Sequence, residues 1–146
     1  KSSKLIKLEK FEKNKKLNNF ETLKTFGKKC LNHRDNLSKL INKIEGNIYG
    51  YGASARSSTL LNFARINYKK IKFIMDKNKL KNGFYTPGTK IKIVKFNKNI
   101  LPNNSNIIIL AWNFKKEIIN QFSKKKNYKF IVPLPNKAKL YENPRY

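Results

Sequence analysis

The stretch IYGYGASAR at residues 48–56 predicts a strand, a sharp turn and the start of a helix. Its first residues are apolar, as in a strand that is buried inside a parallel sheet. Gly50 and Gly52 then begin the pattern G-x-G-x-x-A, in which one glycine allows the turn, one allows close approach of the backbone, and the small residue lets the helix pack on the strand. Since the N–H groups at the start of a helix favour an anion, the stretch is either a phosphate-binding loop or only a tight turn.

Strand-like and helical segments alternate along the rest of the chain. Apolar patterns predict strands at 47–51, 71–76, 90–94, 105–112 and 128–135, and helices at about 19–44, 57–64 and 114–124. The strand at 105–112 should be central, because its four consecutive large aliphatic residues imply burial on both faces. This alternation predicts an α/β, Rossmann-like three-layer fold with a mainly parallel sheet of about five strands, preceded by a long N-terminal helix.

Positive charge dominates the composition. The 146 residues include 34 Lys plus Arg against 8 Asp plus Glu, a formal net charge of +26, which favours an anionic partner. Nearly all of these cations are lysines scattered along the chain, and Lys, Asn and Ile share AT-rich codons. Neither an arginine-rich recognition helix nor a regular interleaving of aromatic and basic residues is present. We therefore expect a small anionic ligand, and a nucleic-acid-binding module is the less favoured alternative.

The length fits one domain. We expect residues 1–18 to be a basic linker from a missing upstream domain and residues 19–146 to form the Rossmann-like domain, and the start at Lys1 supports a piece of a longer protein. The single cysteine, Cys30, excludes an internal disulfide, and no apolar run has the length of a membrane span, so we expect a soluble, cytoplasmic protein without membrane contact. Cys30 and His33 have the spacing of half a metal site, but no other Cys or His can complete it.

Residues that follow the expected strands should meet at one edge of the sheet, since ligands of doubly wound sheets lie beyond the carboxyl ends of the strands. Arg56 follows the glycine hinge and can receive a phosphate. Asp76 ends the second strand, 26 positions after Gly50, where a nucleotide-binding unit keeps an acid for ribose hydroxyls. Alternatively, the two glycines serve only the turn and Asp76 only terminates a strand.

The end of the central strand adds two further candidates. Trp112 can stack on a base or sugar, and Asn113 offers a donor and an acceptor; alternatively, Trp112 fills the sheet edge and Asn113 caps the next helix. Tyr85 lies in a loop that can close over the same crevice. The predicted substrate-binding residues are thus Gly50, Gly52, Ala53, Arg56, Asp76, Tyr85, Trp112 and Asn113.

Catalytic constellations are missing from the sequence. No Ser/His/Asp or Cys/His set is evident, acids are few, and the only histidine lies on a helix face. These absences predict a binding domain without catalytic residues and without a metal. From the residues alone, a standalone SAM- or NAD-binding Rossmann domain remains an alternative.

Three longer motifs occur in a fixed order: YGASARSSTLLNFARI (51–66), FIMDKNKLKNGFYTPGTKIKIV (73–94) and IIILAWNFKKEI (107–118). Together they resemble the C-terminal domain of the SAM-dependent sugar C-methyltransferases, which act on nucleotide-linked deoxysugars. The resemblance covers about residues 20–135. Two positions depart from the family pattern: Arg56 stands where lysine is common, and Lys92 replaces a proline.

The resemblance implies an enzyme of three parts. A small N-terminal domain binds zinc, a middle domain binds SAM and carries most catalytic residues, and the Rossmann-like C-terminal domain helps to bind the nucleotide-linked sugar. This chain would be the third part alone. On this reading SAM belongs to the upstream domain, and the upstream SAM-binding and zinc-binding domains are partners within the same polypeptide.

Overall fold

The computed structural model describes residues 1–122 and 126–142, which divide into two compact units, Lys1–His33 and Arg34–Tyr146. The first unit contains helix α1 (Ser3–Asn14) and the first turns of helix α2 (Phe20–Lys43). Ser2 caps α1 by accepting a hydrogen bond from the Leu5 N–H. Helix α1 therefore occupies most of the segment that we expected to be a linker, and the long helix that precedes the sheet is confirmed as α2.

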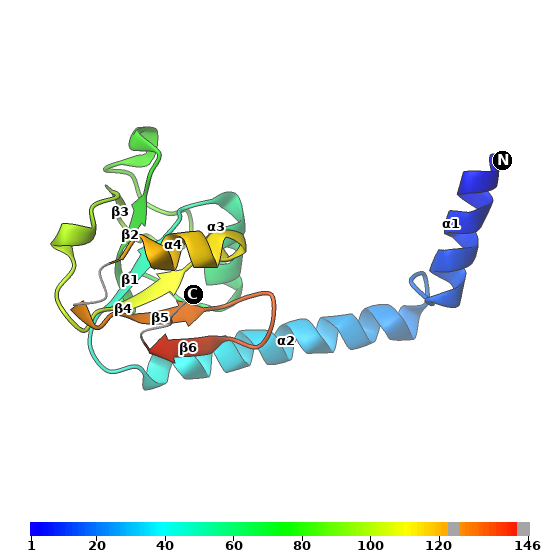
Figure 1. Cartoon of the computed structure of the whole chain (residues 1–146). Coiled ribbons are helices and arrows are strands. Elements are labelled where there is room, and N and C mark those ends of the chain that lie inside the picture. Colours follow the sequence, from blue (N-terminus) through cyan, green and yellow to red (C-terminus); the bar gives the residue numbers. More distant parts are fainter. Residues whose placement is uncertain (123–125, 143–146) are drawn as a thin grey trace. The chain divides into compact units, whose positions relative to one another are not determined.

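The second unit is built on a sheet of six strands in the order β3-β2-β1-β4-β5-β6 (Figure 1). The strands are β1 (Ile48–Tyr51), β2 (Ile71–Asp76), β3 (Ile93–Lys95), β4 (Asn106–Ile109), β5 (Lys129–Val132) and β6 (Lys139–Glu142). The first five pair in parallel, which confirms the mainly parallel sheet, and β6 pairs antiparallel with β5. The sixth strand was not expected from the sequence. Its residues lie at the sheet edge and none is buried, so the segment lacks the apolar run that marks a central strand.

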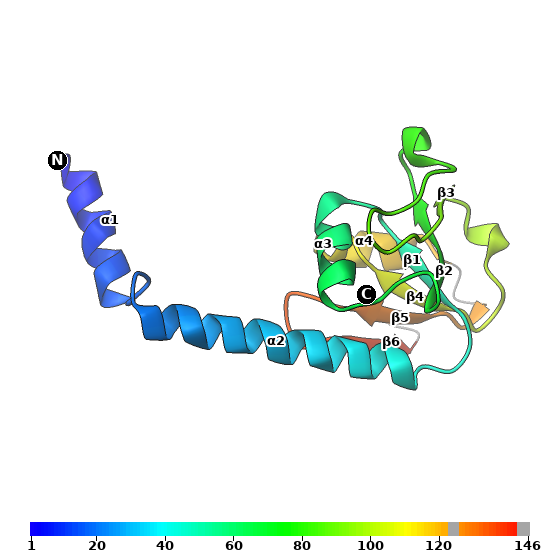
Figure 2. The same cartoon turned by 180° about the vertical axis from the view of Figure 1, so that it is seen from behind.

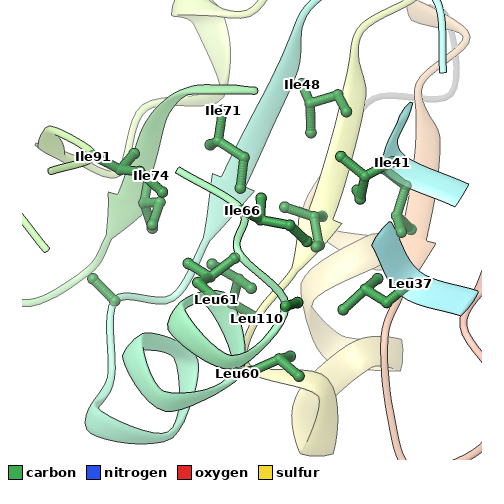
Figure 3. Packing of buried hydrophobic residues seen from close by; sticks show 14 of the residues in the cluster. Leu37, Ile41, Ile48, Leu60, Leu61, Ile66, Ile71, Ile74, Ile91 and Leu110 are labelled. Atoms are coloured by element: carbon green, nitrogen blue, oxygen red, sulfur yellow. The ribbon is translucent and has the colours of Figure 1, made fainter. Parts of the chain in front are cut away.

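Helices cover both faces of the sheet. Helix α4 (Lys115–Asn120) lies in front of the strands in Figure 1, and helix α3 (Ala55–Phe63) lies in front of them in the reverse view of Figure 2. The last turns of α2 bring Leu37 and Ile41 into the same core cluster as α3, which Figure 3 shows. The opposite cluster, under α4, is rich in aromatic rings. The three-layer arrangement is therefore confirmed.

Strand β4 shows why a run of isoleucines marks the centre of this sheet. Ile108 packs in the cluster under α2 and α3, whereas Ile107 and Ile109 pack in the cluster under α4. All four residues of the strand are buried, and its neighbours on both sides are parallel strands. Successive side chains of a strand point to opposite faces of the sheet. When helices cover both faces, consecutive residues must therefore be apolar.

The strand order also sets where a ligand can bind. From β1 the chain moves outward to β2 and β3, then returns to β4 on the other side of β1. The connections that leave the carboxyl ends of β1 and β4 therefore run in opposite directions and leave a crevice between them, which is the usual ligand position in such sheets. Within the described part of the chain, no helix combines the length and apolar character that crossing a bilayer requires.

Candidate functional site

The two glycines of the hinge have different roles. Gly50 lies within β1, and a Cβ atom there would come within 2.6 Å of Cγ1 of Ile74 on β2. Gly52 makes the turn, with φ of +94°, and a Cβ atom there would lie 2.8 Å from Cβ of Ala111. Gly50 thus permits close strand packing, and Gly52 supplies both the turn and the close approach to Ala111.

The N–H groups around the hinge are engaged within the domain. Gly52 N–H donates to the Met75 carbonyl at 2.8 Å, and Ala53 N–H donates to Oδ2 of Asp76 at 2.7 Å. Ser54 and Ser57 form a capping box at the start of α3, in which each backbone N–H donates to the other side chain. A phosphate-binding loop needs such donors to be directed at its ligand, and here they stabilise the turn itself.

Asp76 fastens the end of β2 to the hinge. Besides the Ala53 N–H, its carboxylate accepts the Asn78 N–H at 2.8 Å and pairs with Lys81 Nζ at 3.3 Å, and its side chain is only 13% exposed. Lys81 Nζ also donates to the Ala53 carbonyl at 2.6 Å, so Ala53 is held by the last residue of β2 and by the β2–β3 connection. The sequence reasoning missed Lys81, although its fixed place after Asp76 in the second motif could have indicated it.

Arg56 and Trp112 meet across the two connections that bound the crevice. The guanidinium carbon of Arg56 lies 5.7 Å from the Trp112 ring centroid, a cation–π arrangement. Arg56 is exposed in the first turn of α3. Trp112 is half-buried three residues after the end of β4, where it packs against both core clusters. Asn113 is exposed, and it does not cap α4 because the capping position belongs to Phe114.

A crevice of about 270 Å³ opens at the carboxyl ends of β1, β2 and β4, and neither Arg56 nor Trp112 is among its lining residues. Its polar lining consists of Tyr51, Asp76, Lys77 and Glu117, and Lys77 approaches Glu117 at 3.9 Å. Burial raises the pKa of the Tyr51 phenol above 10.0, and the carboxylates of Glu117 and Asp76 act in the same direction. The phenol therefore stays neutral, and its hydroxyl donates to Oε1 of Gln121 at 3.4 Å. Lys77 and Lys81 balance the two carboxylates, so the crevice has no excess positive charge for a phosphate and suits hydroxyl groups better.

Tyr85 lies outside the residues that line this crevice. It belongs to the β2–β3 connection, where it forms an isolated antiparallel bridge with Lys92, and it is 61% exposed. The following turn is fastened to α3 by Asn62, whose side-chain amide donates to the Pro87 carbonyl at 3.0 Å. The structure thus brings Gly52, Ala53 and Asp76 together, pairs Arg56 with Trp112, and leaves Tyr85 on a separate loop.

The sequence model of the C-methyltransferase C-terminal domain family matches residues 1–135. The chain belongs to this family. A stretch of 90 residues is also 32% identical to the C-methyltransferase NovU of Streptomyces niveus and covers 60% of this chain. That stretch is 21% of NovU, so the chain matches about a fifth of the length of this relative.

Several residues in the second motif of this C-methyltransferase domain stabilise its fold. Asp76 and Lys81 hold the hinge, the Asn78 side chain accepts the Leu80 N–H, and Gly83 has φ of +86°. Tyr85 follows in the same motif, but its side chain is exposed. Tyr51 and Glu117 complete the crevice; the sequence reasoning missed them as site residues, although both stand in the ordered motifs.

The described residues of this C-methyltransferase domain hold no group of three or more His, Cys, Asp or Glu side chains that could bind a metal ion. Cys30 is a free, half-buried thiol, and His33 is half-buried on the same helix. Both lie in the first unit, three residues apart on α2.

Proposed function

We propose that this domain is the substrate-side part of a SAM-dependent C-methyltransferase and helps to bind a nucleotide-linked sugar, which an upstream domain methylates at carbon. The observation that carries this proposal is the Arg56–Trp112 pair at the point where the strand order reverses. A guanidinium can bind a phosphate, and an aromatic ring can stack on a base or a sugar. Both groups lie where Rossmann-like sheets receive their ligands.

The charges at the carboxyl edge of the sheet support separate positions for the diphosphate and the sugar of the ligand. Arg56 lies in the first turn of α3, where the helix dipole adds to its positive charge and favours a diphosphate. The crevice at the ends of β1, β2 and β4 carries the Tyr51 phenol and two carboxylates, Glu117 paired with Lys77 and Asp76 paired with Lys81. The crevice therefore offers no excess positive charge to a phosphate, whereas Glu117 and the phenol oxygen of Tyr51 can accept hydrogen bonds from sugar hydroxyls. The sugar would therefore occupy the crevice while the diphosphate pairs with Arg56.

The hinge itself supports the assignment of SAM to an upstream domain. A SAM or dinucleotide site of Rossmann type uses hinge N–H groups and an acid after the second strand. In this chain the Gly52 and Ala53 N–H groups are bonded to Met75 and Asp76, and Asp76 is bonded further to Asn78 and Lys81. These residues do not fit a cofactor, which speaks against a standalone SAM- or NAD-binding domain. We place the methyl transfer and its catalytic residues upstream on the family resemblance.

Trp112 offers a direct test, because it is the only tryptophan in the chain. We expect nucleoside diphosphates and nucleotide-linked sugars to change its fluorescence in a saturable way. Arg56→Ala should weaken this binding about tenfold or more, the usual effect of losing a charge-assisted hydrogen bond, and Arg56→Lys should retain part of it. Lys69→Ala removes an equal charge from the exposed α3–β2 connection and should have little effect.

The same variants in the full-length enzyme separate substrate from cofactor. Arg56→Ala should raise KM for the nucleotide-linked sugar and leave KM for SAM unchanged. Equal affinity of the wild-type and Arg56→Ala proteins for the nucleotide-linked sugar would refute the proposal. Binding of SAM to this chain alone would instead support the standalone cofactor-binding alternative.

A further inference from the structure

A second cavity lies at the opposite edge of the sheet, where the strands begin. It has a volume of about 290 Å³, and its walls come from the last turns of α2 and from the α3–β2 connection. Its floor is apolar, since Ile41, Ala64 and Ile66 are almost fully buried. Its rim carries Arg34, Arg65 and Lys70 against one carboxylate, that of Asp35, and we call it the α2–α3 pocket.

The arginines distinguish this pocket from the rest of the basic surface. Lysine is abundant along the whole chain, so a lysine beside a cavity does not by itself indicate a binding site. Only four arginines occur in the sequence, and two of them line this one cavity. The planar guanidinium presents a fork of donors that matches the oxygens of a phosphate or carboxylate, which the ammonium of lysine does not.

Arg65 follows helix α3 in a backbone conformation that glycine favours. Helix α3 ends in a Schellman motif, in which Arg65 N–H donates to the Asn62 carbonyl and Ile66 N–H donates to the Leu61 carbonyl. Arg65 occupies the left-handed position of this motif, with φ of +56°. Glycine is the favoured residue there, and an arginine is strained. Lys16 and Lys90 also have positive φ, so it is the place of Arg65 on the rim of the cavity that distinguishes it.

Arg34 is held in position before any ligand arrives. Its Nε donates to Oδ1 of Asp35 at 2.8 Å, and its guanidinium carbon lies 5.8 Å from the Phe63 ring centroid. Asp35 engages the guanidinium through Nε, so the terminal nitrogens form a separate donor edge for a second oxyanion. Ser38 ties the two walls together, because its hydroxyl donates to the Ala64 carbonyl at 2.7 Å.

We propose that the α2–α3 pocket binds the phosphate group of a small phosphorylated ligand, with Arg34, Arg65 and Lys70 as the phosphate-binding residues. The three cations exceed the single carboxylate by two charges, which matches a phosphate monoester. The apolar floor accepts a small organic group. The cavity lies at the lower limit of small-molecule sites, roughly 300 Å³, so it takes a ligand smaller than a nucleotide-linked sugar. This ligand is therefore a second one, separate from the substrate proposed for the crevice.

Phenyl phosphate tests the pocket, because it combines a phosphate with an apolar body. We expect it to bind the 146-residue chain and to shift the NMR signals of the Arg34 and Arg65 side-chain Nε–H groups. Arg65→Gly should weaken the binding about tenfold or more while preserving the fold, because glycine adopts the left-handed conformation readily. Lys69→Gln is the matched control: it removes one charge next to Lys70 and should leave the affinity nearly unchanged.

Several outcomes would overturn the proposal. Equal affinity of the wild-type and Arg65→Gly proteins would show that no phosphate binds at this position. Equal weakening by Lys69→Gln would show that the net charge of the chain attracts the phosphate without a defined site. Benzoate that binds as tightly as phenyl phosphate would show that the pocket recognises carboxylates instead. Phenyl phosphate can also pair with Arg56, so the shift of the Arg34 side-chain Nε–H signal, and not the total affinity, reports the α2–α3 pocket. Arg56→Ala should leave that shift unchanged, which keeps this test independent of the Arg56–Trp112 pair.

Discussion

Replacing Gly52 by alanine should destabilise the domain more than any other glycine-to-alanine change in the hinge. The residue has φ of +94°, a region that costs an L-residue about 1–2 kcal/mol. A Cβ atom would also lie 2.8 Å from Cβ and 3.2 Å from N of Ala111. Ala111 cannot retreat easily, because its N–H and that of Leu110 both donate to the Tyr51 carbonyl. Overpacking of this kind costs about 1–3 kcal/mol, so we expect a total of roughly 2–5 kcal/mol.

The other glycines separate the two contributions. Gly83 has φ of +86° with no atom near a Cβ, so Gly83→Ala reports the backbone cost alone, about 1–2 kcal/mol. Gly50→Ala reports the steric cost alone, about 1–3 kcal/mol, because its Cβ would meet the Ile74 side chain at 2.6 Å. Gly27 lies inside α2 in open space, so Gly27→Ala should stabilise by about 0.5–1 kcal/mol.

Urea unfolding followed by circular dichroism measures all four changes in the free energy of unfolding. The expected order of destabilisation is Gly52→Ala first, Gly50→Ala and Gly83→Ala next, with Gly27→Ala of opposite sign. If Gly52→Ala costs no more than Gly83→Ala, the close approach to Ala111 contributes nothing, and the account of the hinge given above is wrong.

Two further predictions concern the crevice and its supports. Asp76→Ala should destabilise the domain by about 1–3 kcal/mol in denaturant unfolding, because the partly buried Ala53 N–H loses its acceptor. Asp76→Asn keeps one acceptor oxygen and should cost less. Equal costs of the two variants would argue against the hydrogen-bond account. Burial raises the pKa of Tyr51 and Tyr128 above 10.0, so the protonated phenols favour the folded state. Their contribution to stability is present below pH 10.0 and is lost as the pH rises further. In a tyrosinate absorbance titration, Tyr51→Phe should remove signal that develops above pH 10.0, and an unchanged curve in that range would contradict the burial of this phenol.

The alternation of strands and helices could be predicted because it depends on the pattern of apolar residues close together in the sequence. Strand β2 was predicted with its observed bounds, and the buried isoleucines of β4 indicated a central strand, since both depend on apolar residues that are consecutive in the chain. Strand β6 was missed for the same reason. Its four residues pair with β5 at the edge of the sheet, and only this pairing makes them a strand.

The candidate site shows the limit of local signals more clearly. The hinge pattern indicated a turn, but the occupied N–H groups could not be foreseen, because their acceptors Met75 and Asp76 come from another strand. Arg56 and Trp112 were each singled out from the sequence, yet their contact depends on the order in which β1 and β4 are placed in the sheet.

The sequence by itself determined the class of fold, the central strand, the family and the residues at the ends of the strands, because periodicity, apolar runs and ordered motifs are properties of neighbouring positions. The tertiary structure alone decided which polar groups have partners within the protein and which face a cavity. Hydrogen bonds, ring contacts and pockets depend on distances between atoms that are remote in the chain. For that reason Asp76 became a support of the hinge, and Arg34 and Arg65 became the rim of one pocket.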